Sequence, residues 1–473
     1  MPGSRAQGAS YAVGIIKQPS SQYCTASNAS GTVGTASIAN IAVSCVDQIW
    51  TWVGGSNANN SVGVYGAQGI SGSANVPGGR SGSGTSRDAT GGLWMFGGFG
   101  FGSSGAPYYI NDLWRFSPSS KQWTWVSGSS TTNAASDFGI KGVAAASNMP
   151  GARQQPATWS DAAGNLWVFG GAAQGTVGTN DLWMYSPSTG LWTWTAGSAA
   201  PGPAGVYGTL GVSDSSTSPG GRSQAATWVD RSGNLWLFGG YGFDANGSAQ
   251  DLNDLWRFSP VSGLWTWMGG ASTVEATGSF GSKGVAAATN VPGARRAAAS
   301  WTDSSGNMWL FGGASASGQL NDLWKYSPNT NQWVWVSGSS SVNDSGNFGT
   351  RGVPAATNMP GARQLSAAWI DAHDNLWLYG GYGLFGGHEY SDLWMYSTST
   401  GGWICMNGVD GVAYANWGAQ GVAAGANTPG NRRDMAAWID NAGGVWIFGG
   451  TGVAANGQEW TTFSDLWFFN SSM

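Results

Sequence analysis

Two charged residues recur at regular places in this sequence, and they are the first candidates for chemistry. Six arginines could form a ring that binds an anion. Each arginine follows a turn that contains Pro and Gly, and each precedes an aspartate that begins an Asp-Leu-Trp triplet. We favour a structural role, in which each arginine pairs with an aspartate or with backbone carbonyls, because a buried charge needs a partner. The arginines are Arg80, Arg153, Arg222, Arg295, Arg363 and Arg432, and the aspartates are Asp112, Asp181, Asp254, Asp322, Asp392 and Asp465.

Histidines and cysteines are scarce, which limits metal and nucleophilic chemistry. The sequence has two histidines, His373 and His388, and three cysteines. His373 falls in a short turn and His388 in a longer connection, and the repeat described below places these two kinds of connection at opposite faces. A copper centre needs at least two imidazoles that converge, and one loop histidine does not support a Ser-His-Asp triad. We therefore predict no metal site, no cofactor and no catalytic residue.

Two glutamates and a tryptophan in the longer connections are the remaining candidates. Two carboxylates about 5 to 9.5 Å apart suffice for glycoside hydrolysis, but a glutamate in a loop is more often a solvated charge. The tryptophan either fills a local gap or presents a flat apolar face to a sugar. If a ligand binds, we expect contacts from Trp460, Glu459, Trp417, His388 and Glu389.

The composition is that of a turn-rich, aromatic-rich, all-β protein. Glycine supplies 79 of 473 residues and tryptophan 30, while charged residues make up only 9%, where about 25% is ordinary. With 41% apolar residues and a net charge of −5, the chain is not of the disordered class. The high glycine content excludes long helices. The lack of a long apolar run excludes a membrane span, and the lack of a basic patch argues against nucleic-acid binding.

A repeat of about 70 residues organises the chain. An aromatic-Gly-Gly triplet, an Asp-Leu-Trp triplet and a Trp-x-Trp pair recur in order, so each unit reads as four short strands, here called A, B, C and D. Strands B and C are apolar at nearly every position, which means that both sheet faces are covered, and radial stacking of six sheets achieves this. The aromatic-Gly-Gly triplets begin at Phe96, Phe169, Phe238, Phe311, Tyr379 and Phe448.

The two ends of the repeat indicate how the ring closes. One D strand, residues 49–53, comes before any A, B or C strand, and the last unit stops after its C strand. If these partial units pair, six complete blades result. We therefore predict an all-β, six-bladed propeller with four-stranded blades, closed by residues 49–53 pairing with the C-terminal blade.

The order Arg…Trp, Asn-Leu-Trp-x-Phe-Gly-Gly, Asn-Asp-Leu-Trp-x-Tyr and Trp-x-Trp resembles the kelch repeat of the galactose-oxidase-like propellers over residues 47–473. The resemblance implies a binding platform, a structural protein or, in a few cases, a copper oxidase, and the fold alone does not choose among them. A copper oxidase of this kind needs two imidazoles that converge on one metal as well as a cross-linked Cys-Tyr pair. Because His373 and His388 are expected at opposite faces, the copper oxidase is disfavoured.

The connections between strands differ in length, which predicts a functional face. The A–B and C–D turns are tight and share one face, whereas the long D–A and the variable B–C connections share the other. Binding sites usually lie on loops that a rigid scaffold holds, so we expect function on the long-loop face. We expect the aromatic residue repeated in each D–A connection to anchor it onto its own blade; these residues are Tyr65, Phe138, Tyr207, Phe280, Phe348 and Trp417.

Residues 1–46 differ in composition from the rest and form a separate predicted segment. Cys24 and Cys45 bracket two turn-rich strand candidates, which favours a disulfide. The stretch resembles a small β module of bacterial secreted proteins and lipoproteins, and it is too short to bury a core of its own. It is either stapled, packed on the propeller or the tail of a longer chain. Cys405, at a strand D position, is expected to be a packed thiol.

These observations predict a secreted or cell-surface bacterial protein that acts as a binding or scaffold module. Its expected ligand is a glycan or an extracellular protein surface, with no nucleic-acid partner and no membrane span. One alternative is a carbohydrate-active enzyme that uses loop carboxylates. Another is a subunit of an extracellular assembly, joined through its N-terminal β segment by strand pairing.

Overall fold

The computed structural model describes residues 6–13, 22–35, 38, 40–47, 49–383, 389–408, 413–454, 457 and 460–470. All of the elements assigned in these ranges are β-strands. The described residues include no helix that is long and apolar enough to cross a membrane.

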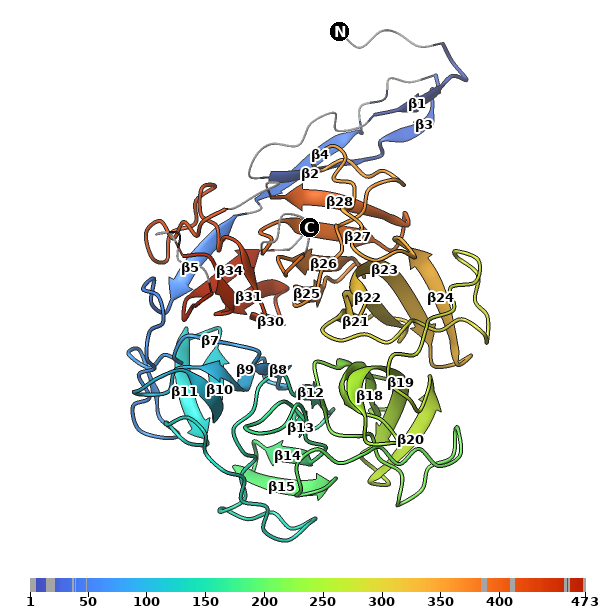
Figure 1. The fold of residues 1–473 in the computed structure, drawn as a ribbon. Coiled ribbons are helices and arrows are strands. Elements are labelled where there is room, and N and C mark those ends of the chain that lie inside the picture. The colour runs from blue at the N-terminus through green and yellow to red at the C-terminus, as the bar shows by residue number, and fades with distance from the viewer. Residues whose placement is uncertain are drawn as a thin grey trace.

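Six antiparallel sheets are arranged as blades around a central axis (Figure 1). Blade 1 contains β7 (Arg80–Ser81), β8 (Gly84–Arg87), β9 (Leu93–Gly100), β10 (Tyr108–Ser117) and β11 (Gln122–Ser127), with β6 (Ser71–Gly72) at its outer edge. Blade 2 contains β12 (Ala157–Ser160), β13 (Leu166–Phe169), β14 (Leu182–Ser186) and β15 (Leu191–Ala196). Blade 3 contains β16 (Arg222–Ser223), β17 (Ala226–Val229), β18 (Leu235–Phe243), β19 (Ala249–Ser259) and β20 (Leu264–Gly269).

The second half of the ring repeats this plan. Blade 4 contains β21 (Ala299–Thr302), β22 (Met308–Ser315), β23 (Gly318–Ser327) and β24 (Gln332–Ser337). Blade 5 contains β25 (Ala367–Ile370), β26 (Leu376–Tyr379), β27 (Leu393–Ser397) and β28 (Gly402–Asn407). Blade 6 contains β30 (Ala436–Ile439), β31 (Gly444–Phe448), β34 (Leu466–Asn470) and β5 (Trp50–Gly54), and a small sheet of β29 (Arg432–Arg433), β32 (Thr451–Gly452) and β33 (Thr461–Thr462) adjoins it.

The predicted closure of the ring by the N-terminal strand is confirmed. Strand β5 pairs antiparallel with β34, with Trp52 opposite Trp467 and Thr51 opposite Phe468. The innermost strands contact one another in the closed order β8, β12, β17, β21, β25, β30 and back to β8. The sequence pattern alone therefore predicted both the number of blades and the strand that closes the last one.

Tryptophans hold neighbouring blades together, which explains why strands B and C are apolar on both faces. In four blades the indole N–H of the strand A tryptophan donates to the backbone carbonyl of a strand B tryptophan in the next blade. The pairs are Trp159 with Trp236, Trp228 with Trp309, Trp301 with Trp377 and Trp438 with Trp94, at 2.9 to 3.2 Å. Each sheet is thus packed between two others and exposes little apolar surface.

The D–A connections run down the outer edges of the blades, a course that the sequence did not predict. In each blade a glycine N–H of the incoming connection donates to a carbonyl of the outermost strand, for example Gly69 to Trp125 and Gly421 to Trp52, both at 2.8 Å. The repeated aromatic anchors the connection onto its own blade, as predicted; the Tyr65 ring lies 4.9 Å from that of Trp114. These connections therefore cover exposed strand edges, and only their ends reach the long-loop face.

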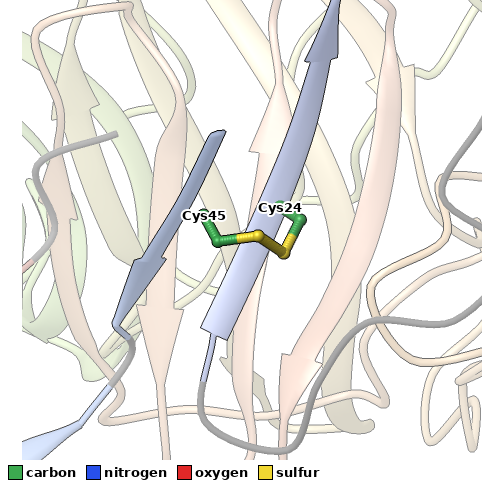
Figure 2. Close-up of a disulfide and its surroundings, with 2 residues drawn as sticks. All are labelled: Cys24 and Cys45. Atoms are coloured by element: carbon green, nitrogen blue, oxygen red, sulfur yellow. A yellow bond between two sulfur atoms is a disulfide. The ribbon is translucent and has the colours of Figure 1, made fainter. Parts of the chain in front are cut away.

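The N-terminal segment forms two short ribbons outside the ring (Figure 1). Strand β1 (Ser10–Ala12) pairs with β3 (Ser30–Thr32), and β2 (Gln22–Ser27) pairs with β4 (Ala42–Asp47). The predicted disulfide joins Cys24 to Cys45 across the second ribbon, where the Cα atoms are 4.0 Å apart (Figure 2). Cys405 is buried, as expected, and burial raises the pKa of its thiol to about 12, so the thiol is unreactive.

Candidate functional site

The six recurring arginines are structural, in agreement with the interpretation favoured from the sequence. Each one pairs with the aspartate of its own blade at 2.5 to 2.8 Å, and the arginine side chains are at most 2% exposed. The tryptophan two residues after each aspartate donates its indole N–H to the same carboxylate at 2.7 or 2.8 Å. The Asp-Leu-Trp triplet is therefore one hydrogen-bonded unit.

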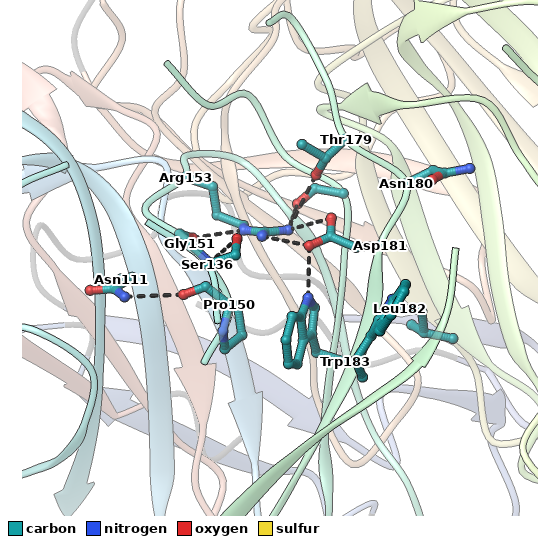
Figure 3. Close-up of polar contacts among 12 residues, drawn as sticks. Asn111, Ser136, Pro150, Gly151, Arg153, Thr179, Asn180, Asp181, Leu182 and Trp183 are labelled. Carbon is teal, nitrogen blue, oxygen red and sulfur yellow. Dashed lines mark hydrogen bonds and ion pairs between the residues drawn. The ribbon is translucent and has the colours of Figure 1, made fainter. Parts of the chain in front are cut away.

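Blade 2 illustrates the unit (Figure 3). Arg153 binds Asp181 through both Nη atoms, at 2.8 and 2.7 Å, and its Nε donates to the Gly151 carbonyl at 2.9 Å. Burial alone would raise the pKa of Asp181, but the charge and hydrogen bonds of Arg153 hold that pKa below its usual value. The carboxylate is consequently ionised and paired, which satisfies both buried charges.

A closed circle of backbone hydrogen bonds surrounds the axis next to these arginines. The residue two positions after each arginine donates its N–H to the carbonyl of the equivalent residue in the preceding blade, at 2.6 to 3.0 Å. All six residues have a positive φ, between 51° and 66°, a backbone conformation that residues other than glycine rarely adopt. Sequence reasoning missed this circle, whose members are Gly82, Gln155, Gln224, Ala297, Leu365 and Asp434.

Two glutamines and a carboxylate of the circle are also joined through their side chains. Gln155 donates its Nε2 to Asp434 at 2.9 Å, and Gln224 donates its Nε2 to the Gln155 Oε1 at 2.7 Å. Gly82 lies between them in the circle, and a Cβ there would come within 2.9 Å of the Gln155 Cγ and 3.0 Å of an Asp434 oxygen. Glycine therefore leaves the space in which the two side chains meet.

Asp434 should make the stability of the propeller depend on pH. Burial raises its pKa to about 6, against the opposing effects of the Gln155 hydrogen bond and of Arg433. The pKa of Asp434 is higher in the folded than in the unfolded state, so the folded state binds the proton more tightly. The free energy of unfolding therefore rises as the pH falls through 6 and Asp434 becomes protonated.

We expect Asp434→Asn to stabilise the protein at pH 7.5 by on the order of 1 kcal/mol, since the amide oxygen still accepts from Gln155 without a charge. The difference should vanish near pH 4.5, where Asp434 is protonated. Denaturant unfolding of both proteins at the two pH values measures this, and parallel pH profiles would contradict it.

Trp460 is the most exposed of the predicted ligand-binding residues that the structure describes. Its side chain is 63% exposed, which does not fit a role in filling a gap. The Arg433 guanidinium carbon lies 4.3 Å from its ring centroid and 4.6 Å from that of Tyr382. An Arg433 Nη1 lies 3.4 Å from a carboxylate oxygen of Glu389. These four residues, which we call the Trp460 cluster, join the B–C regions of blades 5 and 6.

The other predicted ligand-binding residues have different fates. Glu389 is only 7% exposed, so the expectation of a solvated loop charge is wrong; it lies opposite Tyr382 at the base of the loop, where Arg433 pairs with it. Trp417 is half-buried and donates its indole N–H to Asp465 at 2.9 Å, as a loop anchor would. Glu459 and His388 lie outside the described residues.

Metal chemistry finds no support among the described side chains. His373 is exposed in an A–B turn, where its backbone N–H donates to Asp371 at 2.9 Å. The ranges that the structure describes contain no group of three or more His, Cys, Asp or Glu residues placed to hold a metal ion. With His388 outside these ranges, the predicted separation of the two histidines stays a prediction.

Two hollows open on the long-loop face at equivalent places in blades 2 and 4. The hollow of blade 2 has a volume of about 250 Å³ and is lined by Arg153, Thr179 and Asp181 together with alanine-rich loop ends. The hollow of blade 4, at about 200 Å³, is lined by Arg295 and Leu320 at the corresponding positions. Both are smaller than typical drug-sized sites, so each can take only a small group.

The repeat agrees with a known family. Residues 209–403 match a model described as the KLHDC2/KLHL20/DRC7 Kelch-repeats domain. This part of the chain is a kelch-repeat domain. The match runs from the connection into blade 3 as far as the start of β28, and the antiparallel sheets before and after it are consistent with further kelch blades. No curated protein matches the chain significantly. A kelch propeller implies a binding module.

Proposed function

We propose that this kelch propeller is an extracytoplasmic module that binds a glycan on its long-loop face, at the Trp460 cluster. The exposed indole, 63% accessible and stacked against Arg433, supports the proposal most strongly. Tryptophan is enriched at binding interfaces, and a sugar presents C–H groups that pack on an indole face.

The neighbours of Trp460 supply the polar half of such a contact. Arg433 reaches Glu389 with one Nη atom at 3.4 Å, which leaves further N–H groups for ligand hydroxyls. The carboxylate of Glu389 can accept hydrogen bonds from the same hydroxyls. Stacking on one face and charged groups at the side are the elements that carbohydrate sites combine.

The disulfide supports the extracytoplasmic part of the proposal. The Cys24–Cys45 bond joins two strands of a small ribbon, and such structural disulfides persist in oxidising compartments rather than in the cytosol. Measuring the redox state of these cysteines in protein taken from its native host tests this part.

Replacing Trp460 should remove glycan binding without unfolding the propeller. We expect Trp460→Ala to weaken binding about tenfold on a glycan array, because the stacking surface is lost while few core contacts change. Val261→Ala is a matched control, since Val261 is 96% exposed in a C–D turn on the opposite face. Unchanged glycan binding with a lowered melting temperature would contradict the proposal, as would a wild type that binds only proteins.

A further inference from the structure

The Trp460 cluster has an incomplete counterpart at the junction of blades 3 and 4. At three positions of the repeat this junction carries the same kinds of side chain: an arginine, a carboxylate and a tyrosine. The Arg296 Nη1 donates to both carboxylate oxygens of Asp251, at 2.7 and 2.9 Å, and its guanidinium carbon lies 5.4 Å from the Tyr241 ring centroid. The equivalent residues are Arg296 and Arg433, Asp251 and Glu389, and Tyr241 and Tyr382.

The fold itself does not require the pair of Arg296 and Asp251. The other four junctions carry no charged residue at either of these two positions, and their blades are joined all the same. Replacing a buried ion pair by uncharged residues is also often neutral for stability. The pair therefore calls for a role beyond joining the blades. The uncharged counterparts are Tyr109 with Gln154, Gly178 with Ser223, Gln319 with Gln364 and Thr462 with Ser81.

The junction of blades 3 and 4 lacks a counterpart of Trp460. In blade 6 the indole of Trp460 lies over Arg433, with the guanidinium carbon 4.3 Å from the ring centroid. Blade 4 has instead a tight turn between β22 and β23. The Arg296 side chain is accordingly 30% exposed, against 13% for Arg433, and among the described residues Tyr241 is the one ring that it contacts.

A carboxylate without an ion-pair partner among the described residues lies beside Arg296. It belongs to Glu275, which is exposed and whose backbone N–H donates to the Asp251 carbonyl at 2.8 Å. Glu275 and Asp251 both line the hollow of about 200 Å³ in blade 4. Asp251 is paired with Arg296, and Arg295, which also lines the hollow, is paired with Asp322. The uncompensated charge is that of Glu275, so the hollow favours a cationic group.

We propose that this junction binds a protein partner that presents an aromatic side chain to Arg296 and a lysine or arginine to Glu275. The partner's ring takes the place over the guanidinium that Trp460 fills in the other cluster, so the chain's own contact shows the geometry. Arginine stacks well on aromatic faces, and aromatic residues anchor many protein interfaces. A sugar ring has no π electrons to offer the cation. The inference goes beyond the proposed glycan function, because it concerns a different junction and a different class of ligand.

The double variant Asp251→Gln with Arg296→Gln tests the proposal and should fold, because it installs the pair that joins blades 4 and 5, Gln319 and Gln364. The probes are the peptide Lys-Trp-Lys with both ends blocked and the same peptide with leucine in place of tryptophan. Ligand-observed NMR measures both affinities. We expect the wild type to bind the tryptophan peptide about fivefold more tightly, and the double variant to bind the two peptides equally. Glu275→Gln should weaken both peptides and keep the preference.

A second single variant keeps the test independent of the double variant. Arg296→Lys retains the charge but loses the planar face that stacks on a ring, so it should lose most of the preference for tryptophan. Melting temperatures establish that each variant is folded. Equal affinities of the two peptides for the wild type, or a preference that survives in the folded variants of Arg296, would overturn the site.

Further outcomes separate this inference from the proposed function. Glycan binding at the Trp460 cluster should be the same in the double variant as in the wild type. Loss of glycan binding in the double variant would show that the junction takes a glycan and not a protein. A peptide preference that Trp460→Ala abolishes would place the peptide at the Trp460 cluster instead. Absence of glycan binding in the wild type would overturn the proposed function alone, since the peptides report on Arg296 directly.

Discussion

A chain that lacks residues 1–54 should fail to fold cooperatively, whereas one that lacks only residues 1–48 should fold. Strand β5 is the outermost strand of blade 6, and Trp50 within it is 3% exposed, with its ring 5.2 Å from Tyr379 and 4.9 Å from Phe469. Loss of one buried tryptophan costs about 3 to 5 kcal/mol, and the loss of strand pairing adds to this. The sum is comparable with the whole stability of a typical domain.

The deletion also removes the partners of a neighbouring connection. Gly421 donates its N–H to the Trp52 carbonyl at 2.8 Å, and the Asn427 Nδ2 donates to the Trp50 carbonyl at 3.1 Å. Differential scanning calorimetry should show a single sharp transition for the longer chain and none for the shorter. A synthetic peptide of residues 49–55 added in trans should restore the transition in part. Equal stability of the two chains would show that the pairing of β5 with blade 6 contributes little to the free energy of unfolding.

Asp254→Ala should destabilise the propeller by about 3 to 5 kcal/mol, the effect expected when one member of a buried ion pair is removed. The Arg222 and Asp254 side chains are fully buried, 2.6 Å apart. The carboxylate also accepts from the Tyr207 hydroxyl at 2.7 Å and the Trp256 indole N–H at 2.8 Å, so the substitution leaves three buried donor groups without it. Unfolding in guanidinium chloride, followed by tryptophan fluorescence, measures the loss.

Two comparisons make the Asp254 experiment decisive. Asp137→Asn changes an exposed aspartate and should shift stability by no more than about 0.5 kcal/mol. The double variant Arg222→Met with Asp254→Leu removes both charges and should lose less than Asp254→Ala does, because no unpaired charge stays buried. A single variant no more costly than Asp137→Asn would show that the pair contributes little to the fold.

The site was predicted only in part. The exposed position of Trp460 is consistent with one of the two interpretations drawn from its isolated place in the repeat, and the structural role of the arginines was favoured from burial arguments alone. Arg433 was missed, although its signal was present, since a second arginine follows the recurring one in two of the six repeats, at Arg296 and at Arg433. The hollow beside Arg153 was missed as well, because its lining comes from four loop ends that lie far apart in the sequence.

The sequence by itself determined the blade architecture, the closure of the ring and the disulfide. The strand pattern and the Asp-Leu-Trp triplet depend on residues close in sequence, since the Trp256 indole binds an aspartate only two residues away, Asp254. The closure follows from the strand count, because the last repeat lacks a strand D and the only spare strand D is β5. Only the tertiary structure decided the course of the D–A connections, the burial of Glu389 and the circle that joins Gly82 to Asp434. Each of these features depends on partners in another strand or blade. Loop residues can adopt several conformations, and long-range contacts, not the local sequence, select the one that is observed.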